Sequence, residues 1–523
     1  MVVVFATKGK ENAVQQFITK HRATITGTIS CFDRMLFKGH LPLGWPGAME
    51  GFLARQGLRI KDFGPFVNRH SERIKQHAKA TAERCGRPYI HLSGPIRKED
   101  YVQAMVRRDK ITDGLVCVLA AVEACHSFKL AYGEGKPHLV SARRKCLCLY
   151  FYFVDREFGL MHIRITSWFP FMVQVCLNGH DWLARKLDRH GIGYRQADNA
   201  FLSINDPGRA QRLADRFVHK NWPRVLAAFA RRVNPLMNSL LQGMDYYWVT
   251  QQAEYATDVM FQNPAALAGL YDPLLKHATQ HFSAEDVMTF LGRKLHGRFA
   301  GDVGTEYKTR WPGVRVRHRM KENGIKMYNK QGSVLRIETT INRPAEFKVR
   351  RRGHRQGRKV MDWFPMAKGV ANLYRYAEVS RVANHRYLDA LAVVEDPAPA
   401  HQQIHALAQP IRHHHRPYRG FNPADQQDVR LFAAVMRGEH LLQGFANRGI
   451  REQLFSPTTN LLERRRRGAR VSRLLKRLHL HGLIGKVQRS RRWRVTRKGH
   501  ALMTTVLVLH HERYPATLRQ HAA

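Results

Sequence analysis

The chain has 523 residues, 44% of them hydrophobic, and it carries 87 lysine and arginine residues against 41 acidic ones. That hydrophobic content excludes a disordered chain, and the length suffices for about three domains of ~150 residues each. The formal net charge of +46 favours a polyanionic partner, because each cation beside a phosphate releases a condensed counterion. We expect nucleic acid, DNA before RNA, and no membrane partner, since no apolar run reaches ~18 residues.

The N-terminal stretch MVVVFATKGKENAV lacks the charged region, apolar region and cleavage site of a secretory signal, so we expect a cytoplasmic protein. All seven cysteines lie within the first 176 residues, mostly in apolar runs such as GLVCVLAAVEAC and CLCLYFYF. An odd number in a non-secreted chain predicts buried, reduced thiols. Cys146 and Cys148 alternate on one predicted strand and share a face. No CxxC pair occurs, so the spacing does not predict a structural zinc site.

We predict a mixed fold of the α/β class with α+β character. The predicted divisions are an N-terminal α/β domain at 1–220, a middle basic α/β domain at 221–395, a linker at 396–424 and a C-terminal winged helix-turn-helix domain at 425–523. In the first domain the patterns predict helices over 13–22, 49–82, 97–108 and 179–190, strands over 24–36, 145–154, 158–168, 171–178 and 190–204, and a strand or a helix over 115–125.

In the first domain the candidate residues for chemistry are the carboxylates Asp33, Glu123, Asp155, Glu157 and Asp181. Asp33 stands at the end of the first predicted strand, as in an RNase H-like fold. The intervals to the later acids do not follow that fold's order of strands and helices.

The middle domain begins with an amphipathic helical region over 217–241 that is broken at Pro235. The segment DYYWVTQQAEYATDVMF follows, with Glu254 and Asp258 four residues apart. On a strand these two carboxylates share a face, and on a helix they are neighbours, so both alternatives bring them together. Two helices are predicted after it, over 266–282 and 284–297, the second capped by Ser283.

The stretch VRVRHRMKENGIKMYNKQGSVLRIETTIN, residues 314–342, predicts three strands joined by turns ending at Gly324 and Gly332. On the third strand Glu338 shares a face with cationic and amide side chains, opposite an apolar face. Basic groups hold phosphates and a carboxylate binds Mg²⁺ or Mn²⁺, so the stretch suits a phosphodiester site. A basic sheet that only contacts phosphates is the alternative. The candidate metal ligands are Glu254, Asp258 and Glu338, and the candidate phosphate contacts are Arg315, Arg317 and Lys326.

Within this stretch, MYNK followed by LRIETTIN resembles the "IYDKG…RVEL" core of rolling-circle plasmid replication initiators and related phage replication proteins. The resemblance implies that Glu338 takes the role of the family's metal-binding carboxylate and that a downstream tyrosine attacks DNA. The family's aspartate falls on Asn329 here, and no His-hydrophobe-His motif accompanies it.

Two features follow this stretch. The segment FKVRRRGHRQGRKV predicts a basic loop or hairpin tip over 348–359, where Arg350 and Arg352 would contact phosphate; a solvated loop is the alternative. A long helix is predicted over 366–394. Tyr374 and Tyr376 on it are candidate nucleophiles, although aromatic residues at such spacings also pack against sheets.

The linker at 396–424 is rich in Pro, His and Gln, and His413 to His415 could bind a transition metal there. In the C-terminal domain, an apolar stripe at helical spacing is formed by Val471, Leu474, Leu475 and Leu478, and Gly482 ends the predicted recognition helix. LIGKV and RWRVT would flank a wing, as in the winged helices of many bacterial DNA-binding proteins. The predicted DNA contacts are Arg470, Ser472, Arg473, Lys476 and Arg477 on the helix and Arg489, Arg491 and Arg492 on the wing.

Together these features indicate a nucleic-acid-binding protein of a mobile element, phage or plasmid type. It would bind duplex DNA through the winged helix and nick a strand at a Mg²⁺- or Mn²⁺-dependent endonuclease site in the middle domain. The alternative is a binder without catalysis, such as a transcription regulator or a ribonucleoprotein component. The sequence leaves the oligomeric state open.

Overall fold

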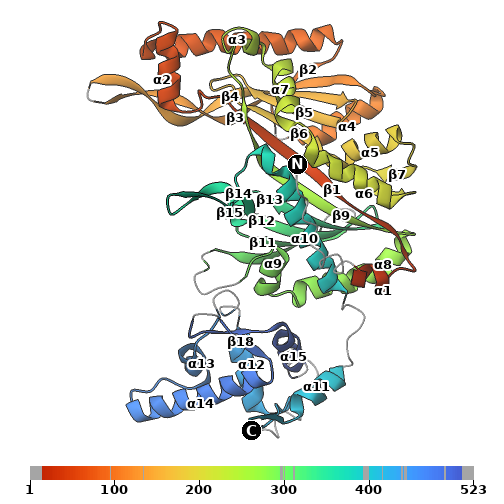
Figure 1. The fold of residues 1–523 in the computed structure, drawn as a ribbon, viewed down its shortest axis with the longest axis vertical. Helices are drawn as coiled ribbons and strands as arrows, with labels where there is room; N and C mark the ends of the chain where they lie inside the picture. The colour runs from red at the N-terminus through yellow and green to blue at the C-terminus, as the bar shows by residue number, and fades with distance from the viewer. Residues whose placement is uncertain are drawn as a thin grey trace. The chain divides into compact units, whose positions relative to one another are not determined.

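The structure is a computed structural model that describes residues 15–94, 96–133, 135–294, 299, 301–309, 313–392, 400–414, 416–437, 440, 444–487, 490–508 and 510. The chain forms two compact units. We call residues 26–260 with 338–381 the central unit, and residues 1–25, 261–337 and 382–523 the terminal unit. The predicted mixed α/β class is confirmed (Figure 1). Among the described helices, none combines the length and apolar character needed to cross a membrane.

The central unit contains a large sheet with helices packed against it. The strands of this unit are β1 (Ile25–His40), β2 (Tyr89–His91), β3 (Gly114–Gly133), β4 (Lys136–Asp155), β5 (Gly159–Thr166), β6 (Val173–Asn178), β7 (Tyr194–Ala197), β8 (Ala200–Ile204), β9 (Tyr247–Phe261), β14 (Lys348–Arg355) and β15 (Arg358–Pro365). The pairs β7–β8 and β14–β15 form two separate small sheets. Its helices are α2 (Pro46–Arg55), α3 (Phe63–Arg84), α4 (Lys98–Arg108), α5 (Gly179–Arg189), α6 (Pro207–Asp215) and α7 (Trp222–Val233), with short 3-10 turns between them.

The strands of the large sheet run in the order β13-β9-β1-β6-β5-β4-β3-β2 across this unit, with β13 spanning Val334–Ile341. β1–β6, β4–β5 and β5–β6 are antiparallel pairs, whereas β2 joins β3 in parallel. Residues 115–125, for which the sequence predicts either a strand or a helix, form part of strand β3. Residues 115–121 of β3 and 148–154 of β4 are buried on both faces, because α2, α3 and α4 pack against these two strands.

Helices α5 and α6 lie beside β1 (Figure 1). Two glycines allow this close approach. A Cβ atom on Gly27 would come within 2.7 Å of the Pro207 ring at the start of α6, and one on Gly179 would come within 2.2 Å of the Phe32 carbonyl oxygen. The start of α5 is therefore held directly against the backbone of β1.

The terminal unit contains four strands in the order β10-β11-β12-β13. They are β10 (Val303–Thr309), β11 (Val314–Met320), β12 (Asn323–Lys330) and the first half of β13. Its helices are α1 (Gln15–Lys20), α8 (Pro264–Gln280), α9 (Ala284–Phe290), the second half of α10 (Leu373–Leu391), α11 (Ala400–Ala408), α12 (Gln426–Val435), α13 (Asn447–Leu454), α14 (Leu461–Leu480) and α15 (Arg497–Val508). Short hairpins pair β16 (Ile411–His413) with β17 (Arg416–Tyr418) and β18 (Ile484–Lys486) with β19 (Trp493–Val495).

The three strands predicted within 314–342 are present, and positive φ angles at Lys321, Gln331 and Gly332 form their tight turns. The third strand, β13, lacks the solvent-exposed polar face that the sequence predicts, because all of its residues are buried. Arg336 is 0% exposed and Glu338 is 2% exposed. Glu338 therefore lies in the interior of the sheet and not on an open basic surface.

The segment expected to be an irregular linker is largely structured. Ala400–Ala408 form α11, and Ile411–His413 pairs with Arg416–Tyr418 as β16 and β17. Leu407 and Phe421 are buried in the core that also contains Val471 and Leu478 of α14. The C-terminal module therefore begins near residue 400. The predicted divisions at 220 and 395 also differ from the two units, whose boundaries fall within β9, β13 and α10.

Candidate metal centre and nucleic-acid surfaces

Three carboxylates converge in the central unit from three neighbouring strands. Asp33 lies on β1, Glu254 on β9 and Glu338 on β13. One carboxylate oxygen from each lies within 4.8 Å of the others. Asp33 and Glu338 are buried, and Glu254 is half-buried. Two of the three predicted metal ligands, Glu254 and Glu338, are thus brought together.

The predicted ligand Asp258 is not part of this cluster, and Asp33 takes its place. Four residues on a strand span ~13 Å, so Glu254 and Asp258 share a face but cannot both hold one ion through oxygens at ~2–2.6 Å. Asp258 is 0% exposed and instead interacts with His180, whose Nε2 lies 3.3 Å from Asp258 Oδ2. The other ring nitrogen, Nδ1, lies 3.4 Å from Asp33 Oδ1. His180 thus links Asp258 to the cluster.

Two amide side chains donate hydrogen bonds to the Asp33 carboxylate. Asn178 Nδ2 donates to Asp33 Oδ1 at 2.6 Å, and Asn199 Nδ2 donates to Oδ1 at 2.7 Å and to Oδ2 at 3.0 Å. Asn178 is also the N-cap of α5, where its Oδ1 accepts from the backbone NH groups of His180 and Asp181. One residue therefore fixes both the start of α5 and the Asp33 carboxylate.

The cluster suits a hard divalent cation. Two unit charges within 4.8 Å repel by about 3 kcal/mol or more at the effective dielectric constant of ~20 that applies near protein surfaces. A cation among Asp33, Glu254 and Glu338 would replace this repulsion by attraction. Carboxylate oxygens are the donors that Mg²⁺ and Mn²⁺ prefer, so the residues present fit the ion that the sequence predicts.

Asp181, which the sequence marked as a further candidate, lies beside the cluster in α5. Burial raises the pKa of Asp181 to about 6; the nearby His180 opposes the rise, and the Asp33 carboxylate adds to it. Gln196 Nε2 donates to Asp181 Oδ1 at 3.3 Å. Asp181 therefore keeps a proton at mildly acidic pH where an ordinary aspartate has lost it.

We expect Asp181→Asn to stabilise the metal-free protein at pH 7 by about 1–3 kcal/mol. The pKa of Asp181 when folded is about 6 and exceeds the ordinary value of ~3.9, so the folded state binds the proton more tightly. Ionisation then costs stability, which should fall as pH rises from ~4 to ~6. Urea unfolding of both proteins across this range measures the difference. Asp245→Asn, at an exposed carboxylate, is the control, and equal pH profiles for wild type and Asp181→Asn would refute the expectation.

Gly179→Ala tests the packing that brings α5 to the cluster. The added Cβ would lie 2.2 Å from the Phe32 carbonyl oxygen, so α5 must move away from β1. Overpacking of this kind costs ~1–3 kcal/mol, and a lower thermal midpoint is the expected result. Gly64→Ala in the first turn of α3 is the matched control, because nothing lies within 4 Å of its Cβ. Equal midpoints for the two variants would contradict the close approach.

The two candidate tyrosine nucleophiles differ in exposure. Tyr374 is 46% exposed, whereas Tyr376 is 0% exposed, and burial raises the pKa of the Tyr376 hydroxyl. Tyr376 cannot reach a phosphate without leaving its site, so Tyr374 is the better placed of the two. Tyr387, on the same helix, is also buried, and its hydroxyl lies 2.9 Å from His318 Nε2.

The basic side chains of β11 and β12 are half-buried. Arg317 lies 3.7 Å from Glu306 on the paired strand β10. Arg315 and Lys326 are likewise engaged in interactions within the protein. These three predicted phosphate contacts are therefore less available than the sequence alone suggested.

The basic segment after them is a two-stranded ribbon, so of the two predicted alternatives the hairpin is the one observed. In the β14–β15 pair, Arg350 stands opposite Trp363 and Arg352 stands opposite Met361, so all four share one face. Trp363 is 48% exposed and Met361 53% exposed. The Arg375 guanidinium lies 5.0 Å from the Trp363 ring centroid. An exposed face that combines arginine with an aromatic ring suits a nucleic acid, by phosphate contact and base stacking.

Arg350→Glu combined with Arg352→Glu should weaken nucleic-acid binding and leave folding intact, since both side chains are exposed. Losing two phosphate contacts should reduce the slope of log affinity against log salt by ~2 for duplex DNA. Fluorescence anisotropy at several salt concentrations measures this slope. Lys79→Glu combined with Arg84→Glu on α3 makes the same charge change elsewhere, and an equal loss in both double variants would contradict a ribbon-specific contact.

In the C-terminal module the predicted recognition helix is part of α14, after which Gly482 has a φ of 72°, and β18 and β19 lie in the two segments predicted to flank the wing. Helices α12 and α13 precede them and were not predicted. Four of the predicted helix contacts, Arg470, Ser472, Arg473 and Lys476, are exposed on α14. Arg491 and Arg492 are exposed near β19, and Arg489 lies outside the described residues. Ser472 Oγ accepts a hydrogen bond from Asn447 Nδ2 at 2.9 Å.

Arg477 is the exception and does not face solvent as predicted. Its side chain is 14% exposed and makes two hydrogen bonds to Asp428, at 2.9 and 3.0 Å. Its Nε donates to the Arg419 carbonyl oxygen, and its guanidinium lies 3.8 Å from the Phe421 ring centroid. Arg477 joins α14 to the segment before α12, so its role is structural. Periodicity along α14 could not indicate this role, because Asp428 and Phe421 lie about 50 residues earlier in the chain.

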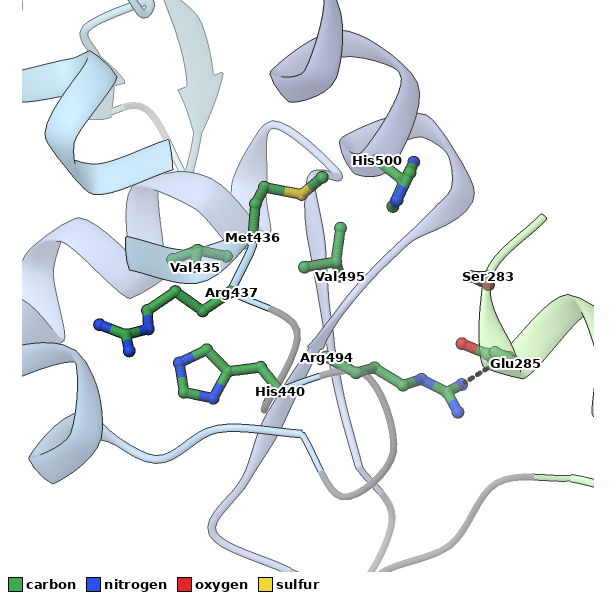
Figure 2. A pocket seen from close by; sticks show the side chains of 9 residues that line it. All are labelled: Ser283, Glu285, Val435, Met436, Arg437, His440, Arg494, Val495 and His500. Carbon is green, nitrogen blue, oxygen red and sulfur yellow. Dashed lines mark ion pairs between the residues drawn. The ribbon is translucent and has the colours of Figure 1, made fainter. Parts of the chain in front are cut away.

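A small cavity lies in the terminal unit beside Arg494, which reaches Glu285 at 2.8 Å (Figure 2). Its volume of about 20 Å³ is close to that of one water molecule. The side chains around it in Figure 2, Met436, Arg437 and His500 among them, therefore enclose no substrate site.

Comparisons with protein-family models, with curated proteins and with solved structures gave no match to this chain. The candidate site therefore stands on its own geometry. Sequence reasoning missed Asn178, His180 and Asn199, because ordinary polar residues at strand and helix ends carry no distinctive spacing. Asp33 did carry a signal, as a carboxylate within the apolar strand TITGTISCFDRML.

Proposed function

We propose that the protein is a metal-dependent enzyme that cleaves phosphodiester bonds in nucleic acid, most simply by nicking DNA. The observation that carries the proposal is the convergence of Asp33, Glu254 and Glu338 within 4.8 Å on three adjacent strands. A net charge of +46 and the exposed basic face of the β14–β15 ribbon supply the complementary surface for a polyanion. The likeness of MYNK and LRIETTIN to replication initiators supports nicking and an origin in a mobile element, phage or plasmid.

In this proposal Mg²⁺ or Mn²⁺ would be held by Asp33, Glu254 and Glu338. A bound ion of this kind polarises the phosphoryl oxygen and stabilises the charge that develops during displacement. His180 would be a positioning residue, since Nδ1 lies 3.4 Å from Asp33 Oδ1 and Nε2 is hydrogen-bonded to Asp258. Asn178 and Asn199 fix the Asp33 carboxylate through their amide groups.

The attacking group is either water or the Tyr374 hydroxyl. Attack by water leaves two free ends, whereas attack by Tyr374 forms a phosphotyrosine bond and releases one strand end. Exposed arginines of α14, such as Arg473, would hold duplex DNA, in the manner proposed for a winged helix.

The test is incubation of the purified full chain with labelled single-stranded and duplex DNA, and with RNA, in the presence of Mg²⁺ or Mn²⁺. Denaturing electrophoresis should reveal cleavage that requires the metal. A labelled band that migrates with the protein and disappears in Tyr374→Phe would identify the tyrosine route. Binding without cleavage of any of these substrates would overturn the proposed activity and leave a non-catalytic regulator or ribonucleoprotein component.

A further inference from the structure

Three cysteines meet on one face of the β3–β4 hairpin in the central unit. Cys125 lies on β3, and Cys146 and Cys148 lie on β4, opposite Glu123 and Ala121 in the register of the pair. Their three sulfur atoms all lie within 4.8 Å of one another, and the Cys125 and Cys148 sulfurs are 3.3 Å apart. All three side chains are buried, at 4%, 8% and 0% exposed respectively.

A buried guanidinium is directed at these sulfurs from the next strand. Arg164 on β5 donates from Nη2 to Cys148 Sγ at 2.9 Å and to Cys125 Sγ at 3.6 Å. The same nitrogen donates to Glu123 Oε2 at 2.9 Å, while Nη1 donates to Gln174. A cation beside a thiol favours the thiolate, which is the form that binds metals. Arg164 Nε also donates to Glu123 Oε2 at 3.2 Å, so one guanidinium faces both a carboxylate and the sulfurs.

We propose that Cys125, Cys146 and Cys148 bind a thiophilic metal ion and that Zn²⁺ is the ion favoured. Zn–S bonds of ~2.3 Å in tetrahedral geometry place sulfur atoms ~3.8 Å apart. The three sulfurs here lie within 4.8 Å of one another, and the Cys125–Cys148 separation is 3.3 Å. The cluster lacks the oxygen donors that Mg²⁺ and Mn²⁺ require, so it is distinct from the carboxylate site. The missing CxxC spacing is no obstacle, since the hairpin supplies Cys125 from the opposite strand.

The net charge of the occupied site favours Zn²⁺ over Cu⁺, the other common thiophilic ion. Three thiolates with Arg164 and Zn²⁺ are neutral together, whereas Cu⁺ leaves one buried negative charge. The Glu123 carboxylate is balanced separately by Lys98, whose Nζ lies 3.1 Å from Glu123 Oε1. Burying an uncompensated charge is expensive, so the neutral arrangement with Zn²⁺ is preferred.

The experiment uses Co²⁺ as the probe, because a sulfur-to-cobalt charge-transfer band appears only when thiolates are ligands. Reduced, metal-free full-length protein is titrated with Co²⁺, and the band should saturate at one ion per chain. Zn²⁺ should then displace it. Displacement by Cu⁺ and not by Zn²⁺ would overturn the assignment of Zn²⁺.

Cys148→Ser and Cys125→Ser should each abolish the band. Two variants are used so that the test remains valid if one of them does not fold. Cys117→Ser is the matched control, since Cys117 is a buried cysteine of β3 outside the cluster. No band with the wild-type protein, or a band unchanged in both cluster variants, would overturn the proposal. The result is independent of the proposed cleavage, which depends on carboxylates that give no such band.

Discussion

Glu338→Gln is expected to reduce metal-dependent cleavage at least about 100-fold while nucleic-acid binding persists. The substitution keeps the size and polarity of the side chain but removes one of the three charges that would hold the ion. A bound metal contributes several kcal/mol of transition-state stabilisation, and each ~1.4 kcal/mol is a tenfold change in rate. Initial rates of cleavage with labelled DNA in Mg²⁺ or Mn²⁺ measure the effect.

The control for this variant is Asp245→Asn, which removes a carboxylate that is 78% exposed on its side chain and lies outside the cluster. Its cleavage rate should equal that of the wild type. Because Glu338 is buried in β13, circular dichroism and thermal unfolding must accompany the assay. A folded Glu338→Gln protein that cuts as fast as the wild type would eliminate this site and leave Asp155 and Asp181 as alternatives.

Arg477→Ala should destabilise the C-terminal module by about 3–5 kcal/mol, since removal of one partner leaves a buried charge unpaired. The partner Asp428 is 3% exposed, and it keeps only a hydrogen bond from the Asn422 backbone NH, at 2.9 Å. Hydrogen exchange of the full chain measures the loss locally. Protection of amides in α12 and α14 should fall by about two to four orders of magnitude, because each ~1.4 kcal/mol is a factor of ten.

Arg473→Ala is the matched control on the same helix, because its side chain is exposed and its removal should change stability by less than ~0.5 kcal/mol. The two variants should also differ in function. Arg473→Ala should weaken duplex binding without loss of protection, as expected for a phosphate or base contact. Unchanged exchange rates in Arg477→Ala would show that the Asp428 pair does not stabilise the module.

The local elements could largely be predicted from the sequence, because period-2 and helical patterns are local properties. β11 and β13 appear where the alternation indicates them. β12 begins at Asn323, because the first turn lies at Lys321 and Gly324 is already paired within the strand. The predicted helix over 179–190 corresponds to α5, with Asn178 as its cap. The single strand predicted over 190–204 is instead the pair β7 and β8, which forms a small sheet of its own.

The candidate site could be predicted only in part, because strand order is a long-range property. Glu254 and Glu338 were found as carboxylates in a basic region, but pairing of β9 with β1 decides that Asp33 joins them. Asp258 was assigned by its spacing from Glu254, and the same spacing places it too far along β9 to share an ion. The Cys125 cluster was missed for the same reason, since its members come from two strands of one hairpin.

Mn²⁺ binding measured by electron paramagnetic resonance tests the central claim most directly, because free Mn²⁺ gives a strong signal that is lost when the ion is bound. The account predicts one bound ion per chain in the wild type and in Asp245→Asn, and an affinity at least about tenfold lower in Glu338→Gln. One equivalent of Zn²⁺ is added beforehand, so that the thiol cluster is occupied and does not contribute to the measured Mn²⁺ binding. Equal Mn²⁺ affinity in the wild type and Glu338→Gln, or no binding by the wild type, would contradict the account.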